Sequence, residues 1–334
     1  MDLNVKDRKI LAELDLNARA SFQEIAKKVR LSKETVIYRV RNLEKREIIG
    51  RYTTLVNFSQ LGYTGYAVYS RFQNVTEEKK KELIEYLSEM PEVYWIALVG
   101  GKFDLVFAVI CKSVFQFNII YYQILTKYGK YLVDNTISIR TELRQHKRKY
   151  LSEDRNVKEA PFFGKEPEVE KIDALDEDIL SLLSNNARMN IVDIAYYLHK
   201  PVSTIALRLN KMEKRNLIQG YSSYICTQKY GVQSYRLLIN VEHINELKRK
   251  ELFSYIGANS FMILGIETVG EWNFEITLEV ENHEQLQKQI SQLRNHFEDT
   301  IKKIEFIIMF EDDLVYDPYP LKKQERKKLI QKKV

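Results

Sequence analysis

Residues 31–49 read LSKETVIYRVRNLEKREII. Ser32 is a good N-cap for a helix, and Val36, Val40 and Leu43 recur at the spacing of a single helix face. The residues between these three are mostly charged or polar, which is typical of an amphipathic helix. The stretch therefore predicts a helix with one face in a core and the opposite face in solvent.

Two shorter helices precede this one. Residues 5–14 and 22–29 carry apolar side chains at helical spacing, and a tight turn separates the second of them from the quoted stretch. The residues that follow, IIGRYTTLVNF at 48–58, alternate like a β-hairpin. Three helices and a hairpin in this order predict a winged helix-turn-helix over residues 1–60.

The next ninety residues have a different pattern. Helical runs alternate with strand-like runs, in the order strand 63–72, helix 77–90, strands 93–100 and 102–111, helix 114–129 and strand 132–143. The order βαββαβ is that of the ferredoxin-like fold. Residues 61–150 are therefore predicted to form a ferredoxin-like domain.

The whole pattern occurs twice. A shift of 169 residues, without a gap, aligns Asn17-Ala18-Arg19 with Asn186-Ala187-Arg188, and it still aligns Gly101 with Gly270. The predicted fold class is α+β, with two tandem copies of a winged helix-turn-helix followed by a βαββαβ domain. The remaining boundaries are a linker at 151–172, a second winged helix-turn-helix at 173–229, a second βαββαβ domain at 230–318 and a basic tail at 319–334.

Charge is distributed unevenly along the chain. The net charge is +6, but residues 321–334 alone carry +6, residues 1–60 carry +5 and residues 173–229 carry +1. The overall charge therefore gives no argument for nucleic-acid binding. The local charge of the first winged helix-turn-helix, residues 1–60, does give one. The basic tail is either a solvated helix end or a set of additional phosphate contacts.

The composition excludes several classes of protein. Cys111 and Cys226 are too few for a disulfide framework or a cysteine-based zinc site, and the five histidines are scattered, so no metal site and no cofactor are expected. No apolar run reaches the length of a membrane span, and the polar start is not a signal peptide. A cytoplasmic protein that does not bind membranes is expected.

Both copies resemble the Lrp/AsnC family of transcription regulators. Three signatures carry the resemblance: the opening Asp7…Ile10-Leu11…Asn17-Ala18-Arg19, the helix at 31–49, and Gly101-Lys102-Phe103-Asp104, which is similar to the family's Gly-x-x-Asp turn. The resemblance implies a regulator that binds double-stranded DNA. It also implies self-association through the βαββαβ (RAM-type) domains, as a pseudo-dimer within the chain and as a homo-oligomer.

The third helix of each head is the predicted DNA-reading element, because an α-helix fits the major groove. In copy one the predicted DNA-binding residues are Ser32, Lys33, Glu34, Thr35 and Tyr38 near bases, with Arg39 and Arg41 on the backbone. Arg39 lies nearer the buried edge, where it reaches a phosphate or pairs with a carboxylate. In copy two the predicted residues are Ser203, Thr204, Leu207, Arg208 and Lys211.

The second head departs from the first at two positions. Pro201 replaces Ser32, which removes the hydroxyl cap, and Leu207 replaces Tyr38. Two readings stay open: the second head reads a different half-site, or it has lost DNA binding and packs against protein.

The resemblance further implies an amino-acid effector in a cleft between paired βαββαβ domains. The predicted effector-binding residues are Gly100, Gly101, Asp104, Gly270 and Asn273. Glycines allow close approach, and a carboxylate accepts hydrogen bonds from an ammonium group. The alternative is a tight turn whose Asp caps backbone amides.

A rival hypothesis is enzymatic, because siroheme decarboxylases share this two-domain fold. That family carries an Arg-Arg-Ile-Gly stretch in the wing and a His-Asn-Tyr motif after the first strand of the sheet. Here the wing reads Ile49-Gly50-Arg51-Tyr52, and no histidine follows the strand that ends Arg71-Phe72-Gln73. A DNA-binding regulator that is not an enzyme is therefore the preferred hypothesis. The remaining alternative is a protein-interaction module with a degenerate DNA-binding head.

Overall fold

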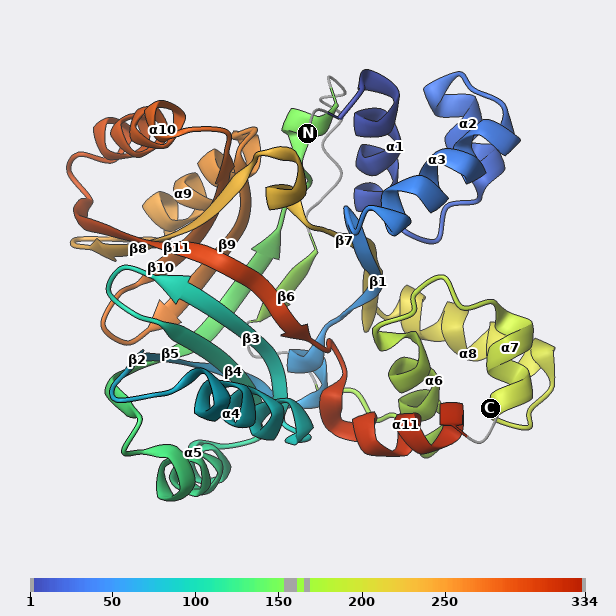
Figure 1. The fold of residues 1–334 in the computed structure, drawn as a ribbon, viewed down its shortest axis with the longest axis horizontal. Helices are drawn as coiled ribbons and strands as arrows, with labels where there is room; N and C mark the ends of the chain where they lie inside the picture. Colours follow the sequence, from blue (N-terminus) through green and yellow to red (C-terminus); the bar gives the residue numbers. More distant parts are fainter. Residues whose placement is uncertain (1–2, 153–160, 165–168, 332–334) are drawn as a thin grey trace.

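A computed structural model describes residues 3–152, 161–164 and 169–331. Two helical heads lie on one side of the molecule, and a body of β-strands with helices on its outside lies on the other (Figure 1). None of the described helices combines the length and apolar character needed to span a membrane.

Each head contains the three predicted helices. The helices of head one are α1 (Val5–Leu16), α2 (Phe22–Val29) and α3 (Lys33–Lys45), and those of head two are α6 (Ala174–Ser184), α7 (Ile191–Tyr197) and α8 (Val202–Lys214). Val36, Val40 and Leu43 form the buried face of α3, as their spacing predicts. Ser21 and Glu24 form a capping box that starts α2.

The predicted wing hairpin is wrong. Residues of the wing form one strand, β1 (Ile49–Val56), which pairs antiparallel with β7 (Ile218–Ile225) of the other copy, with Thr53 opposite Ser222. A hairpin needs a tight turn between two strands of the same wing. Instead, β1 is followed by η1 (Phe58–Leu61) and β7 by η3 (Thr227–Tyr230), and each 3₁₀ turn leads to the ferredoxin-like domain of its own copy. In the described part of the chain, β1 and β7 therefore form a two-stranded sheet that joins the two copies.

Both ferredoxin-like domains are present. Copy one consists of β2 (Thr64–Phe72), α4 (Glu77–Glu89), β3 (Val93–Gly100), β4 (Leu105–Cys111), α5 (Val114–Tyr128) and β5 (Leu132–Gln145). Copy two consists of β8 (Gln233–Val241), α9 (Glu246–Ala258), β9 (Met262–Val269), β10 (Phe274–Val280), α10 (His283–His296) and β11 (Ile301–Tyr316). The predicted βαββαβ order is thus confirmed in both.

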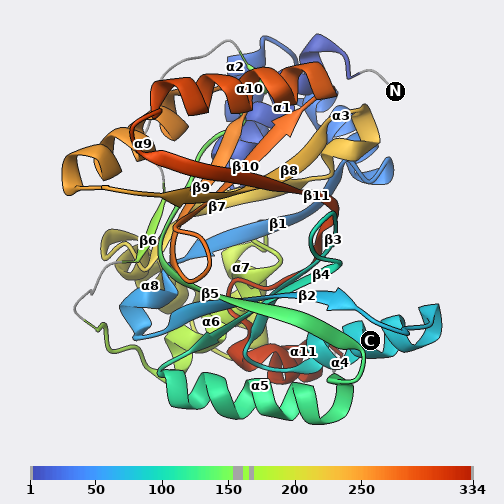
Figure 2. The ribbon, with the colours of Figure 1, turned by 90° about the vertical axis from the view of Figure 1, so that its left-hand side faces the viewer.

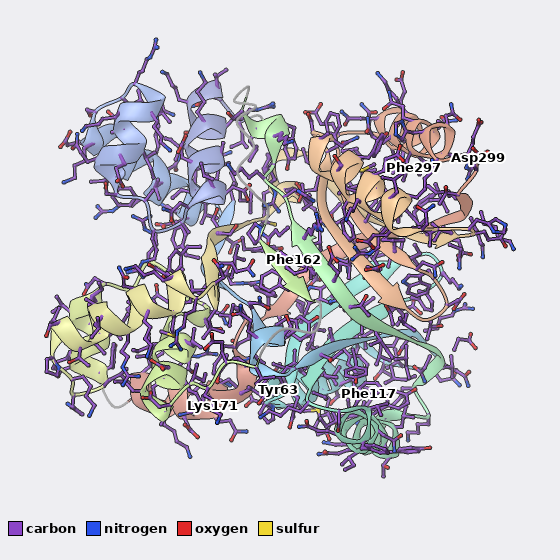
Figure 3. All side chains as sticks on the ribbon, turned by 180° about the vertical axis from the view of Figure 1, so that it is seen from behind. Tyr63, Phe117, Phe162, Lys171, Phe297 and Asp299 are labelled. Atoms are coloured by element: carbon purple, nitrogen blue, oxygen red, sulfur yellow. The ribbon has the colours of Figure 1, made fainter. Side chains whose placement is uncertain are left out.

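The two sheets close into one barrel. Their strand orders are β5-β2-β4-β3 and β11-β8-β10-β9, and the edges join through β3–β11 and β5–β9. Helices α4 and α5 cover one outer face, and α9 and α10 cover the other (Figure 2). Viewed from behind, Phe117 of α5 and Phe297 after α10 mark these two opposite faces (Figure 3). The pseudo-dimer implied by the sequence is therefore formed within one chain.

The linker and the tail both pack on this body. Where the linker begins, η2 (Lys149–Leu151) contacts α1, and within the linker β6 (Phe162–Gly164) pairs with β5. The tail forms η4 (Pro320–Lys322) and α11 (Lys323–Gln331).

The described part of the tail is not a loose basic extension. Lys323 is buried and donates to the carbonyl oxygens of Ser88 and Val93, both at 2.9 Å. This burial lowers the pKa of Lys323 to about 8. Arg326 pairs with Asp317. These two cations are committed to intramolecular contacts, so neither predicted role of the tail applies to them; residues 332–334 lie outside the described residues.

Candidate nucleic-acid interface

The start of α3 is held by its own side chains. Ser32 Oγ accepts a hydrogen bond from the Thr35 backbone N–H at 3.1 Å and lies 2.9 Å from Thr35 Oγ1. This cap satisfies an end of the helix that would otherwise need water or a ligand. Lys33 and Glu34 follow immediately and are exposed.

The outward face of α3 is open to solvent as predicted from its spacing. The Tyr38 side chain is 73% exposed, and Arg41 and Lys45 are exposed on the same helix. Cations and a phenol on an exposed helix are suited to phosphates and base edges in a major groove.

Arg39 has a different environment from Arg41. Its Nη1 donates to Asp7 Oδ1 of α1 at 2.9 Å, and the carboxylate is buried. Of the two partners left open by the sequence, a phosphate or a carboxylate, this geometry provides the carboxylate. Arg39 therefore ties α3 to α1, whereas Arg41 remains available.

Head two repeats this internal bond but not the exposed surface. Arg208 Nη1 lies 2.7 Å from Asp173 Oδ2 and 3.2 Å from Asp176 Oδ2, which matches the Arg39–Asp7 pair. Pro201 at the N-cap makes no side-chain hydrogen bond. Ser203 and Lys211 are exposed and Thr204 is half-buried.

The exposed surface of head two is apolar where that of head one is polar. The 169-residue shift replaces Gln23, Lys27, Lys33 and Tyr38 with Val192, Tyr196, Val202 and Leu207. All four replacements are exposed, and Leu207 is 70% exposed. Two cations of a potential phosphate-binding surface are absent from head two.

A pair of arginines that the sequence analysis did not single out fixes the heads to one another. Arg19 Nη1 donates to the carbonyl oxygens of Ala187 (2.5 Å) and Met189 (3.1 Å). Reciprocally, Arg188 Nη1 donates to the carbonyl oxygens of Ala18 and, at 3.1 Å, Ala20. The signal was present, because Asn-Ala-Arg is repeated in both copies, but repetition alone does not show what the arginine contacts.

The reciprocal contacts of Arg19 and Arg188 form what we call the Arg19–Arg188 clamp. Two tyrosines of the wing strands pack against it. The Arg188 guanidinium lies over the Tyr52 ring and the Arg19 guanidinium over the Tyr221 ring, at 5.4 and 5.1 Å. Burial, and then a hydrogen bond to Glu44, raises the pKa of Tyr52; burial and Glu213 do the same for Tyr221. Both phenols therefore remain protonated donors, and the two arginines and two tyrosines join the heads in a reciprocal set of contacts.

The predicted effector residues lie on two turns that meet across the copies. Lys102 of the first turn pairs with Glu271 of the second. Asp104 Oδ2 accepts from the Phe72 backbone N–H at 2.8 Å, and Asn273 Oδ1 accepts from that of Val241 at 2.9 Å. These side chains therefore already cap backbone amides.

The glycines of these turns are required by close neighbours. A Cβ on Gly100 would lie 2.4 Å from the Phe310 ring, and one on Gly270 would lie 2.7 Å from the Ile137 carbonyl oxygen. Gly101 adopts φ +110°, a conformation that favours glycine. Close packing of the two copies accounts for Gly100 and Gly270, and backbone conformation accounts for Gly101.

Comparisons with known proteins agree with this geometry. Residues 3–44 match the AsnC-type helix-turn-helix domain, and residues 172–219 match a winged helix-turn-helix DNA-binding family. An HTH-type transcriptional regulator of Pyrococcus abyssi is 30% identical over 109 residues, which are 32% of this chain and 72% of that protein. The regulator Ptr1 of Methanocaldococcus jannaschii is 32% identical over 108 residues, with the same coverage of both chains.

A solved structure matches the tandem arrangement as a whole. The siroheme decarboxylase NirDL superposes with a TM-score of 0.60 over 98% of this chain and 99% of its own, at 12% sequence identity. This likeness concerns the fold alone.

The fold and the two heads thus define a helix-turn-helix protein of the transcription-regulator class. The chain belongs to the Lrp/AsnC family, and it carries two copies of the family's module, as the internal repeat predicted.

Proposed function

We propose that this protein is a sequence-specific DNA-binding transcription regulator in which one chain supplies both reading heads. The observation that carries the proposal is the exposed surface of α3, with Lys33, Tyr38 and Arg41 free of the packing that occupies Arg39. The Arg19–Arg188 clamp supports a fixed separation of the heads, and a fixed separation selects one spacing of half-sites.

Because the heads present different side chains, the preferred operator should be asymmetric. Selection of bound sequences from a random duplex pool, followed by mobility shift, tests this. Enrichment of one strong half-site beside a weak or different one supports the proposal. Enrichment of perfect palindromes would contradict it, because equivalent heads from two chains would then be paired.

We also propose that an amino acid or another small effector modulates DNA binding through the barrel. Both wing strands lead directly from the heads into the barrel strands, so a change in the barrel has a short covalent route to the heads. Calorimetric titration with the twenty amino acids tests the amino-acid version; no heat with any of them would contradict it.

Self-association between chains is proposed to use α5. Its outer side carries Phe115, Ile119 and Tyr122, which are 80%, 68% and 61% exposed and lie at i, i+4 and i+7 on one face. An exposed stripe of large apolar side chains marks an association surface. The equivalent positions of α10 are polar (Glu284, Lys288 and Ser291), so of these two helices α5 alone carries such a face, and pairing of α5 with α5 closes at two chains.

A second candidate function is a decarboxylase-like enzyme, favoured by the full-length fold match. Against it, no histidine follows the strand that ends Arg71-Phe72-Gln73, where siroheme decarboxylases carry a His-Asn-Tyr motif. Purification of the chain with a bound pigment that gives a Soret band would favour the enzyme. Colourless protein that does not bind an added iron porphyrin would favour the regulator.

A further inference from the structure

A cavity of about 150 Å³ lies where the wing strands cover the mouth of the barrel. Strands β1 and β7 contribute one wall, and β3, β5, β8, β9, β10 and β11 contribute the barrel side. The wall is largely apolar and aromatic, with Phe58, Tyr94 and Trp95 among its residues. Figure 3 shows the nearby Phe162 of β6 between the heads and the barrel.

This cavity gathers buried polar atoms that have no partner. Among the described residues, ten buried side-chain nitrogens and oxygens lack a hydrogen bond, and five of them belong to residues that line this cavity. The five atoms are Arg140 Nε, Arg236 Nε, His146 Nε2, Ser223 Oγ and Thr277 Oγ1. Unsatisfied buried polar groups are costly, so their concentration in one place points to a ligand that satisfies them.

Two of these residues, Arg140 and Arg236, share a single carboxylate, that of Glu275. Glu275 Oε2 lies 3.3 Å from both Arg140 Nη2 and Arg236 Nη1, and all three side chains are buried. Burial opposes ionisation of Glu275, but the two arginines outweigh it and lower its pKa. Nearby Arg148 pairs with two carboxylates, Asp15 and Glu279, so the three arginines and three carboxylates of this wall balance as a whole. The excess of one guanidinium is local to Arg140 and Arg236, which share the single carboxylate of Glu275.

The other half of the barrel demonstrates that the fold does not need this polar cluster. The 169-residue shift relates Arg140, Ser138, Arg236, Glu275 and Thr277 to Met309, Ile307, Ala67, Val106 and Ala108. All five counterparts are buried in an apolar cluster. Since buried ion pairs contribute little stability compared with apolar packing, stability alone does not account for the cluster.

We propose that this cavity is a binding site for a small organic anion, with one carboxylate on Arg140 and Arg236, whose guanidinium groups lie over the Trp95 ring, and an apolar body against the other apolar side chains of the wall. The hydroxyls of Ser223 and Thr277 complete the polar end. The volume suits a body the size of one aromatic ring. Binding itself does not depend on the proposed DNA function, whereas an effect on DNA does.

The test uses the full chain, phenylacetate as the probe and phenylacetamide as its neutral counterpart. We expect phenylacetate to bind in calorimetry and to raise the unfolding temperature, and the amide to bind at least roughly tenfold more weakly, because charge-assisted hydrogen bonds are the stronger ones. Arg236→Gln should weaken phenylacetate binding by roughly tenfold and leave the amide nearly unaffected. Arg41→Gln on α3 is the control and should not change either value.

Thr277→Val keeps the test decisive if Arg236→Gln unfolds the protein. It removes a hydroxyl that has no protein partner, so thermal stability should hold or rise while phenylacetate affinity falls several-fold. The proposal is overturned if benzoate, phenylacetate, indole-3-acetate and L-phenylalanine all fail to bind, or if the amide binds as well as the acid. Competition between phenylacetate and uroporphyrin would overturn the assignment of a small ligand.

A final measurement separates binding from regulation. If phenylacetate binds but leaves the DNA mobility shift unchanged, the site stands and its regulatory role fails. If DNA binding itself is absent, only the proposed function fails.

Discussion

The two copies of the module share a backbone and differ in surface. Head one is basic and exposes Lys27, Lys33 and Tyr38, whereas head two exposes Tyr196, Val202 and Leu207 at the same positions. In the barrel both copies contribute to one polar cluster, Arg140 and Ser138 from copy one and Arg236, Glu275 and Thr277 from copy two, and the counterparts of all five are apolar. Duplication has thus allowed the chain to carry one basic head and one polar cluster instead of two of each.

The same division applies to the outer helices. α5 presents an apolar stripe and α10 a polar face, although both cover equivalent sides of the barrel. A homodimer of single-copy chains would carry every site twice. A fused pair can carry each site once, and this difference can be tested by exchanging side chains between the copies.

The largest expected effect is on DNA binding through head one. Lys33→Ala/Arg41→Ala should weaken binding to a selected site by roughly 100-fold, since each lost contact costs about 1–3 kcal/mol. Mobility shift with protein of unchanged unfolding temperature measures this. Val202→Ala/Asn210→Ala changes the equivalent positions of head two and is the matched control. An equal loss from it would show that both heads contribute equally to DNA binding.

A smaller effect is expected from making head two resemble head one. Val202→Lys/Leu207→Tyr restores the cation and the phenol of α3, so affinity should rise by about tenfold and the preferred site should become more symmetric. Repeating the sequence selection with this variant is the measurement. Unchanged affinity together with an unchanged site would indicate that head two does not approach DNA.

Disrupting the apolar stripe of α5 should halve the mass of the assembly in solution. Phe115→Glu/Ile119→Lys places charges on the apolar stripe of α5 and should convert a dimer of chains to single chains in light scattering. Lys288→Glu on α10 is the corresponding control and should leave the mass unaltered. A dimer that survives the α5 change would place the interface elsewhere.

The smallest effect concerns pH. Burial, followed by Lys149 and Arg144, lowers the pKa of His146 to about 4, below its usual value of 6.5. The unfolded chain therefore binds a proton more readily, and this histidine reduces stability as pH falls from about 6.5 towards 4. His146→Val, which copies Val315 of the second module, should narrow the difference in unfolding temperature between pH 7 and pH 5; an unchanged difference would contradict the shift.

Local elements were predictable because their signals are local. The bounds of α2 and β3 agree with the predicted 22–29 and 93–100 to the residue, since caps and apolar spacing lie within a few positions. The partner of β1 was not predictable in this way. Alternation identifies a strand but carries no information about which distant segment pairs with it.

The reading helix was predictable and the cavity was not. The face of α3 follows from its 3.6-residue period, so Tyr38 was expected in solvent. Ser138 and Arg140 alternate with Ile137 and Ile139 on β5, which indicates a strand with one solvated face. In a closed barrel the polar face is the inside, because α4 and α5 cover the apolar one.

The exchange of wing strands has a consequence for how this chain is made. The core of head one includes Ile225, Tyr230 and Val232, so it stays incomplete until the second wing strand and the start of the second ferredoxin-like domain have left the ribosome. Head two in turn buries Ala18 and Val56 of the first copy. Neither copy is a finished unit, and a chain severed between them would have to reassemble from two halves before either head could fold.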